Sequence, residues 1–184
     1  MALGAQFEDV LSAARHGAGW ALTVLYRELH PRLLRYLRVE VGQDADDVAS
    51  EVWVNVAEAL PRFAGDEAGF RSWVFTIARR RVLDLRRRRT RRRTDPVPAD
   101  TLESTGDLAV DDIERAVESL AADAALAYLV EQVSPDQAEV VLLRIVGGFN
   151  VDETAAIVDK SPGAVRALQH RALNRLAKRI SLVP

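Results

Sequence analysis

Arginine is concentrated in one stretch of the sequence, residues 71–93, and its side chain is well suited to binding phosphate. The stretch has eleven basic residues and one acidic residue, a net charge of +10. The planar guanidinium group donates two parallel hydrogen bonds to a phosphate, which the ammonium group of lysine cannot do. A GC-rich genome also favours Arg codons, so the choice of Arg over Lys does not decide the function by itself.

A second basic stretch lies at the end of the sequence. Residues 160–184 contain six basic residues and no acidic residue, whereas residues 1–70 have a net charge of −5 and residues 94–159 of −13. The near-neutral total of −2 therefore hides two cationic patches in an anionic chain. Such asymmetry indicates nucleic acid or an acidic surface as a partner.

The residues that could support catalysis are few and scattered. His16, His30 and His170 lie in three different segments, and Gly147-Gly148 lacks the Lys-Ser/Thr of a phosphate-binding loop. The absence of Cys excludes disulfides, thiolate metal sites and cysteine nucleophiles. The sequence therefore predicts that the protein is not an enzyme and has no cofactor and no metal site. A pure scaffold that binds no nucleic acid remains an alternative.

Targeting signals are also missing from the sequence. No apolar run approaches the ~18 residues typical of a membrane span. The first ten residues do not combine a basic start with an apolar core, as a signal peptide would. We therefore expect a cytoplasmic protein without membrane insertion.

Hydrophobic periodicity predicts an all-α fold, because almost every patterned segment has helical spacing and none alternates like a strand. Pro31 marks a break or kink in the second helix, Gly42 ends it, Asp44 can cap the third, and Pro61 ends that one. The expected helices in the first half cover residues 6–15, 20–39, 44–60 and 70–93.

The basic helix has two different faces. Its apolar face carries Phe70, Trp73, Val74, Ile77 and Ala78. Arg81 and Asp84 fall on the same side, three residues apart, and can pair. The helix is therefore expected to dock on a core and to present guanidinium groups on the opposite face, which holds Ser72, Thr76, Arg79 and Arg86, with Arg80 and Arg87 toward its edges.

Residues 94–110 contain two prolines, a glycine and four acidic residues without a helical stripe, which is typical of a linker. We therefore predict two small helical domains, residues 1–93 and 111–184, joined by this flexible acidic linker. The expected helices of the second domain cover residues 111–133, 135–146, 151–158 and 161–180. The first of these has Ile113, Val117, Leu120, Leu126 and Leu129 as apolar anchors. The second of these helices has a strong start signal, with Ser134 as N-cap, Pro135 at the first helical position and Gln137 at the third.

Residues 151–180 have the spacing of a helix-turn-helix. Ala155 is small where the second helix must approach, Asp159 stands where the turn needs a left-handed residue, and Val165 faces inward. The second helix has a predicted inner stripe of Val165, Ala172, Leu173, Leu176 and Ile180. Its outer side suits a major groove. A plain helical hairpin would have the same spacing, but the +6 charge favours DNA binding.

The helix at 44–60 is acidic, with Asp46, Asp47, Glu51 and Glu58. Acidic groups repel DNA, so this face suggests a protein partner.

The order of these parts resembles a known family. The string DADDVASEVWVNVAEALPRFAGDEAGFRSWVFTIARRRVLDLRRRR resembles region 2 of the extracytoplasmic-function (ECF) sigma factors, which are sigma-70-type bacterial transcription initiation factors. The string SPDQAEVVLLRIVGGFNVDETAAIVDKSPGAVRALQHRALNRLAKRI resembles their region 4. Together the two likenesses cover about residues 20–93 and 112–180.

The resemblance implies that the protein binds the clamp helices and flap of core RNA polymerase and directs the enzyme to promoter DNA. It also implies a cognate anti-sigma factor as a further partner. For polymerase binding the implied residues are Asp46, Asp47, Glu51 and Asn55. For recognition and melting of the minus-10 element they are Phe63, Arg71, Arg79, Arg80, Arg86, Arg87 and Arg88. For the minus-35 element they are Ser161, Gly163, Arg166, His170, Arg171, Asn174 and Lys178.

One alternative stays open from the sequence. A stand-alone helix-turn-helix regulator would bind a palindromic site as a dimer and would need no polymerase. The sigma-factor hypothesis predicts poor promoter binding by the isolated chain, because the acidic segments can screen the basic helix until polymerase holds both domains on DNA.

Overall fold

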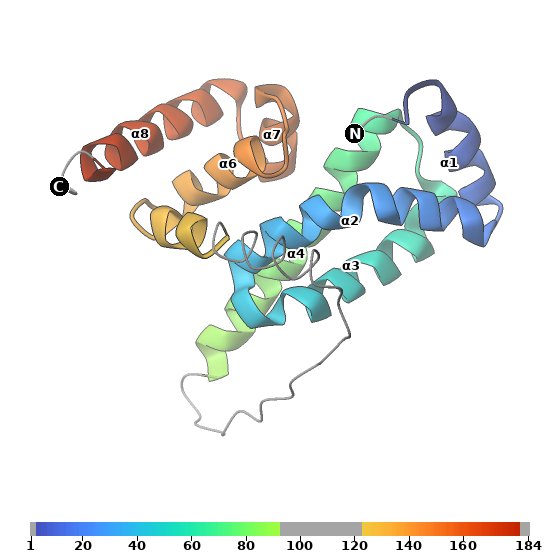
Figure 1. Cartoon of the computed structure of the whole chain (residues 1–184), viewed down its shortest axis with the longest axis horizontal. Helices are drawn as coiled ribbons and strands as arrows, with labels where there is room; N and C mark the ends of the chain where they lie inside the picture. The colour runs from blue at the N-terminus through green and yellow to red at the C-terminus, as the bar shows by residue number, and fades with distance from the viewer. Residues whose placement is uncertain (1–2, 93–122, 181–184) are drawn as a thin grey trace, which may run out of the picture.

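The computed structural model describes residues 3–92 and 123–180 of the chain. All regular structure in these two ranges is helical (Figure 1), which confirms the all-α prediction. The predicted linker 94–110 and the anchors Ile113, Val117 and Leu120 lie outside the described residues. The α-helices are α1 Phe7–Arg15, α2 Gly19–Val41, α3 Ala45–Ala59, α4 Glu67–Arg92, α6 Pro135–Ile145, α7 Val151–Val158 and α8 Pro162–Ile180, with short 3-10 turns at Gly4–Gln6, Gly42–Asp44 and Leu60–Arg62. Residues 123–130 are also helical.

Helix α2 passes through Pro31 without interruption, so of the predicted break or kink the break does not occur. Pro31 is exposed, and the carbonyl that loses its hydrogen bond can bind water instead. The helix is held on its inner side, where Leu29 and Leu33 are buried. Gly42 ends α2 as predicted, in a backbone conformation with φ 65° that favours glycine.

Helices α1 to α4 enclose a hydrophobic core. Phe70, Val74 and Ala78 of α4 are buried as predicted, while Trp73 and Ile77 are only partly buried. Phe75 is also fully buried, although it lies off the predicted apolar face. Its ring contacts Tyr36 of α2, with ring centroids 5.4 Å apart. Helix α4 therefore buries two sides instead of one.

The predicted pair of Arg81 and Asp84 does not form. Arg81 instead donates from Nη2 to Oδ1 of Asn55 in α3, at 2.9 Å, and lies 3.7 Å from a carboxylate oxygen of Glu51. Asp84 pairs with Arg87, one turn further along α4. A neighbouring helix can offer a partner in better position than the three-residue spacing within a helix, and sequence spacing does not reveal it.

Asp44 stands at the N-cap position of α3, but its side chain makes no cap hydrogen bond. Its carboxylate forms an ion pair with Arg89 of α4 instead. The predicted cap is therefore wrong, because a charged guanidinium group is a stronger partner for a carboxylate than a backbone amide. The first turn of α3 keeps Asp46 and Asp47, where the helix dipole favours negative charge.

Helices α6, α7 and α8 begin at well-defined caps. At α6 the Gln137 side chain accepts a hydrogen bond from the Ser134 amide at 3.1 Å, as the sequence predicts. At α7 the Asn150 side chain accepts from the amides of Asp152 and Glu153, both at 2.9 Å, a cap that our sequence analysis missed. Ser161 accepts from the Ala164 amide at 3.2 Å at the start of α8.

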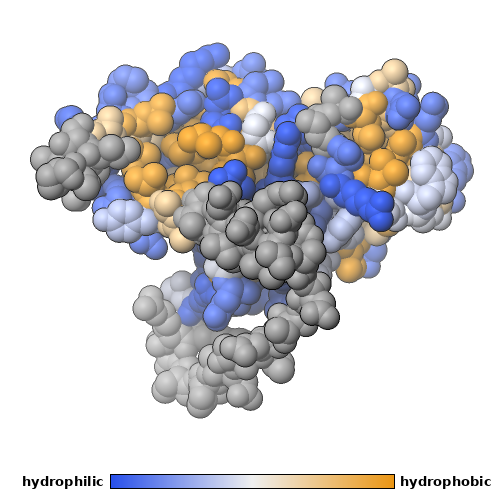
Figure 2. All heavy atoms as spheres, in the orientation of Figure 1, coloured by the Kyte–Doolittle hydropathy of each residue, from blue (hydrophilic) through white to orange (hydrophobic). Residues whose placement is uncertain are grey.

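The core of the first four helices continues into this second group. One cluster of buried side chains joins residues of α1 to α4 with Val140 and Leu143 of α6, Phe149, and Ile157 of α7. In the view of Figure 2 hydrophobic residues gather over both groups of helices, with hydrophilic residues between them. Within the described residues, no helix is both long enough and apolar enough to span a bilayer.

Candidate nucleic-acid interface

The turn between α7 and α8 sets the direction of α8. Asp159 adopts the left-handed conformation predicted for this position, with φ 56° and ψ 51°. Ala155 and Val165 are buried where the two helices meet. A smaller cluster made by Val133, Val141, Ala172 and Leu176 holds the rest of α8 against α6. The local geometry is therefore that of a helix-turn-helix, and it leaves one long side of α8 open.

The open side of α8 carries the residues predicted to face DNA. All seven of them are exposed: Ser161, Gly163, Arg166, His170, Arg171, Asn174 and Lys178. Asn174 Nδ2 lies 3.3 Å from Nε2 of His170, one turn before it. Leu173 is 45% exposed, so its predicted place in the inner stripe is wrong. It lies one residue from the true inner position, Ala172, and rotation by about 100° turns it toward solvent.

The N-terminus of α8 adds a backbone donor to this surface. The first amides of a helix have no partner within the helix and attract phosphate. Of the first three residues of α8, Pro162 has no amide hydrogen and the Ala164 amide donates to Ser161, which leaves the Gly163 amide for a phosphate. Ser161 and Gly163 are exposed there. Lys160 lies beside them and pairs with Asp136 of α6 at 3.0 Å. This end of α8 can therefore hold the DNA backbone while the following turns face base edges.

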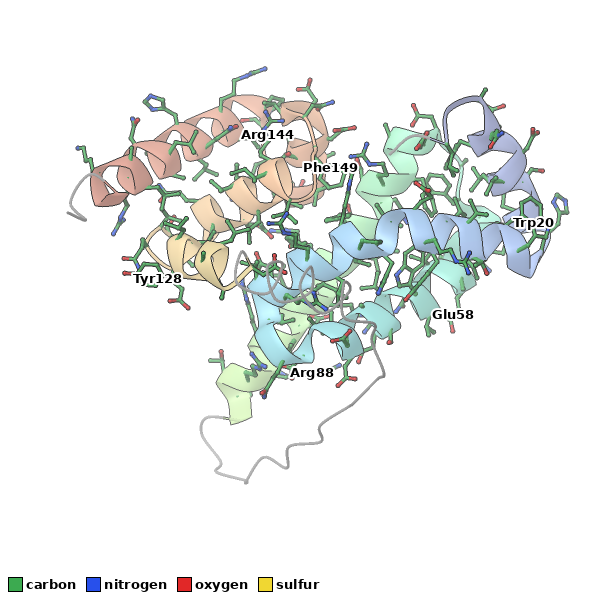
Figure 3. The ribbon with its side chains drawn as sticks, in the orientation of Figure 1. Trp20, Glu58, Arg88, Tyr128, Arg144 and Phe149 are labelled. Carbon is green, nitrogen blue, oxygen red and sulfur yellow. The ribbon has the colours of Figure 1, made fainter. Side chains whose placement is uncertain are left out.

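Helix α4 carries the second basic surface, at its C-terminal half (Figure 3). Arg80, Arg87 and Arg88 are exposed along it. Arg86 forms an ion pair with Glu40 at the end of α2, and this guanidinium is half-exposed while the Glu40 side chain is buried. Arg86, which belongs to the arginine-rich stretch, therefore links α4 to α2.

Two of the predicted minus-10 residues are only partly exposed, and both make hydrogen bonds to the second group of helices. Arg79 donates from Nε and Nη2 to the two carboxylate oxygens of Glu139 in α6, at 2.7 and 3.3 Å. Arg71 donates from Nη2 to the Gly147 carbonyl oxygen at 3.3 Å. We expected Arg79 on the open side of α4, but α6 covers that side.

Phe63 follows α3 in the loop that leads to α4. Its ring stacks on Trp73, with centroids 4.9 Å apart, and meets Phe70 edge to face at 5.6 Å. Gly65 lies close to this ring, since a Cβ there would come within 2.9 Å of it. Aromatic packing therefore fixes the position of the loop. Phe63, the residue of this loop predicted to contact DNA, is only partly buried.

The acidic face of α3 lies on another side of α4. Asp46, Asp47 and Glu51 are exposed, and the half-buried Asn55 is held by Arg81. Behind this face lies an aromatic cluster that our sequence analysis missed. Trp53 donates to His30 Nδ1 at 3.3 Å, and the His30 ring stacks on Tyr26 at 4.4 Å. Only the three-dimensional packing of α2 on α3 brings these side chains together.

Within residues 3–92 and 123–180, three titratable groups have shifted pKa values. Burial, with a smaller contribution from the Glu139 carboxylate, raises the pKa of Glu40 to about 7 against the attraction of Arg86. Burial also raises the pKa of Tyr36 well above its ordinary value, with Glu40 adding to the shift. Burial lowers the pKa of His30. Glu40 and Tyr36 lie where α2, α4 and α6 meet. The packing of these three helices therefore depends on whether Glu40 is charged.

Comparison with known families assigns the two groups of helices. The family model described as Sigma-70 region 2 matches residues 25–92, and the model described as Sigma-70, region 4 matches residues 123–176. The ECF RNA polymerase sigma factor ShbA of Streptomyces griseus is 38% identical over 172 residues, which cover 89% of each chain. The ECF RNA polymerase sigma factor SigD of Mycobacterium tuberculosis is 34% identical, over 96% of this chain and 85% of its own.

Two solved structures share the fold. One is CnrH in complex with the cytosolic domain of CnrY, with a TM-score of 0.69 and 21% identity over 97% of this chain and 99% of that chain. The other is the sigma factor RpoE in complex with the anti-sigma factor NepR from Bartonella quintana. Its TM-score is 0.66 and its identity 20%, over 88% of this chain and 98% of that chain.

Proposed function

Because the chain belongs to the ECF RNA polymerase sigma factors, we propose that it binds core RNA polymerase and directs it to promoters for transcription initiation. The observation that carries this proposal is the joint presence of regions 2 and 4, in order, each with an arginine-rich helix surface. In this role the protein acts in the cytoplasm and catalyses no reaction itself. Binding energy for the separated strand offsets the cost of unstacking, which is about a few kcal/mol.

The exposed side of α8 reads the minus-35 element in this proposal. Arg166 and His170 lie in the N-terminal half of the helix, the part that reaches base edges in a helix-turn-helix. Arg171, Asn174 and Lys178 follow toward its C-terminal end. The guanidinium of Arg166 can bind O6 and N7 of a guanine together, which is the commonest specific contact in the major groove.

The loop with Phe63 and the basic side of α4 recognise and open the minus-10 element. Arg80, Arg87 and Arg88 are exposed and can bind the phosphates of that strand. Such contacts release counterions and carry no sequence information, so they add affinity at every promoter alike.

The acidic face of α3 is the proposed contact with polymerase. Asp46, Asp47 and Glu51 share the exposed side of this helix, and Asn55 extends the face by one turn. This negative face repels DNA and attracts a basic protein surface. DNA and polymerase are therefore directed to different surfaces of the protein.

An anti-sigma factor is a further proposed partner. The two solved structures described above are complexes, of RpoE with the anti-sigma factor NepR and of CnrH with the cytosolic domain of CnrY. A cognate protein of this type would inhibit the chain by occluding its polymerase-binding and DNA-binding surfaces.

Run-off transcription tests the proposed function. Purified core polymerase is incubated with genomic DNA, with and without the protein, and new 5′ ends are mapped. We expect new transcription start sites only when core polymerase and the protein are both present. Each start site should be preceded by shared minus-35 and minus-10 sequences. DNA binding without polymerase, at a palindromic site and with no new 5′ ends, would identify a stand-alone regulator instead.

A further inference from the structure

The loop that leads from α3 into α4 consists of residues 63–66, and both of its ends are hydrogen-bonded. At its start, the Phe63 amide donates to the Leu60 carbonyl oxygen at 3.0 Å. At its end, Oδ1 of Asp66 accepts a hydrogen bond from the Gly69 amide at 2.8 Å and caps α4. The next residue, Glu67, is the first residue of α4.

Two consecutive backbone amides near the N-terminus bind the Glu67 carboxylate. The Leu3 amide donates to Oε1 at 3.0 Å, and the Gly4 amide donates to Oε2 at 3.1 Å. Leu3 has right-handed dihedral angles, φ −64° and ψ −20°, whereas Gly4 has a positive φ of 53°. A right-handed residue followed by a left-handed one turns successive amides toward the same anion, an arrangement called a nest. The Glu67 carboxylate therefore occupies an anion nest formed by Leu3 and Gly4.

A row of aromatic rings links α1 to the same loop. Phe7, the first residue of α1, is 3% exposed, and the centroid of its ring lies 5.9 Å from that of Phe70. Phe70 in turn meets Phe63, which stacks on Trp73. Helix α1 also packs against the 3-10 turn Leu60–Arg62 just before the loop, and Figure 1 shows α1 beside the chain that leads into α4. The N-terminal residues therefore contact the chain on both sides of the loop.

Contacts on both sides restrict the conformations that a loop of four residues can adopt. Hydrogen bonds to a carboxylate are stronger than those between neutral groups, so the contact with Glu67 holds its end of the loop well. The model of Sigma-70 region 2 matches residues 25–92, and the nest and Phe7 lie outside that match. The position of the loop thus depends on residues that the match to region 2 does not include.

We propose that the Leu3-Gly4 nest and the Phe7 ring form a brace for the loop of residues 63–66, and that Glu67 is a positioning residue for recognition of the minus-10 element. The role in recognition rests on the proposed function, whereas the brace itself does not. Glu67 acts through the loop and not on DNA, because a carboxylate repels phosphate.

Hydrogen exchange of the full chain, measured by NMR, tests the brace without DNA or polymerase. Glu67→Ala removes the acceptor, and Gly4→Ala disturbs the donors because an alanine is strained at a φ of 53°. The hydrogen-bonded amides of Phe63, Gly69 and Phe70 report on the two ends of the loop. Each variant should speed their exchange by at least about threefold. Unchanged exchange in both variants would refute the brace.

The two variants support each other. Glu67→Ala also removes a negative charge from the first turn of α4, where the helix dipole favours it. Gly4→Ala leaves Glu67 in place, so faster exchange in this variant comes from the nest. If only Glu67→Ala speeds exchange, the effect belongs to the end of α4 and the brace is wrong.

Each variant has a matched control. Glu8→Ala removes an exposed carboxylate that lines the same cavity as Glu67. Gly19→Ala adds a methyl group where no atom lies within 4 Å, as Gly4→Ala does, but Gly19 does not have a positive φ. Both controls should exchange as the parent does. Faster exchange in the controls, as large as in the test variants, would show that the nest has no special part in holding the loop.

Transcription with core polymerase tests the role of Glu67 in recognition. Run-off product from promoters with one substituted base pair is divided by product from the parent promoter, which gives the discrimination at each position. Glu67→Ala and Gly4→Ala should reduce discrimination at the minus-10 element by about three- to tenfold and leave discrimination at the minus-35 element unchanged.

A merely structural role gives a different result. A loss of folded protein lowers transcription from all promoters alike and leaves the discrimination at both elements as in the parent. That outcome would refute the positioning role of Glu67. If the parent itself directs no specific transcription, the proposed function fails, while hydrogen exchange still decides whether the brace exists.

Discussion

Arg166 and Arg88 both carry a guanidinium group, but their surroundings give them different roles in the proposed function. Arg166 lies on α8 in the first turns, where a recognition helix reaches base edges, and Arg88 lies on the outer side of α4. Contacts to bases depend on sequence, whereas contacts to phosphate do not.

Arg166→Ala should therefore reduce transcription selectively. We expect a loss of about 1–3 kcal/mol that disappears when one base pair of the minus-35 element is already substituted. Arg88→Ala should weaken all promoters alike. Run-off transcription on a set of single-base promoter variants measures both effects. If both substitutions had the same effect on every promoter, this division of tasks would be wrong.

Glu40 makes the stability of the fold depend on pH. Its pKa is raised from 4.5 to about 7, chiefly by burial. Between these two values the unfolded chain releases the proton while the folded chain keeps it. The free energy of unfolding should therefore fall as pH rises from about 4.5 to about 7, by at most about 3 kcal/mol. The stabilising effect of low pH is fully present below 4.5 and is lost above 7.

Glu40→Gln should flatten this dependence, because an amide does not titrate. Urea unfolding at several pH values between 4.5 and 8 measures it. Glu58→Gln, at an exposed site of α3, is the control and should leave the dependence intact. If Glu40→Gln left the slope unchanged, Glu40 would not be the group responsible.

Helix boundaries could be predicted from the sequence where they depend on neighbouring residues. Apolar periodicity, Pro61, Gly42 and the Ser134-Pro135 start placed the helices within a few residues, since helix ends depend on neighbouring side chains. The open face of α8 was predicted for the same reason. The environment of Arg79 could not be predicted, because its partner Glu139 lies 60 residues away in the sequence. No local sequence pattern indicates that these two side chains pair. Phe75 and Arg81 were misjudged for the same cause.

The turn between α7 and α8 stores a small amount of strain. Asp159 has positive φ, where a Cβ crowds the backbone. Asp159→Gly should stabilise region 4 by roughly 0.5–1 kcal/mol, and Asp159→Ala should destabilise it, since Ala lacks the polar side chain that makes this conformation tolerable. Urea unfolding compares the two. Stabilisation by both would point to removal of the charge and not to relief of strain.

At the scale of the whole molecule, charge is divided among surfaces that meet different partners. Arg80, Arg87 and Arg88 on α4 and the exposed side of α8 face DNA in the proposed function, and the acidic side of α3 faces polymerase. Other charged side chains form ion pairs within the molecule, as Arg86 does with Glu40 and Arg79 with Glu139. The net charge of the chain therefore says little about its affinity for DNA.

The salt dependence of DNA binding should reveal this division. In complex with core polymerase, the logarithm of the promoter-binding constant should fall linearly with the logarithm of salt concentration. Arg88→Ala should reduce the slope by about one, since one phosphate contact is lost. Filter binding between about 50 and 200 mM salt measures it. An unchanged slope would place Arg88 away from phosphate.

Gly147 has a simple genetic consequence. Its position has no room for even one methyl group, because the Leu143 carbonyl and the Phe149 ring are both 2.6 Å from where a Cβ would lie. Glycine and alanine codons differ by a single base. One point mutation is therefore enough to displace the Phe149 ring, which packs on Phe75 of α4, so the packing of the α6–α7 loop on α4 can change through a residue that lies in neither basic surface.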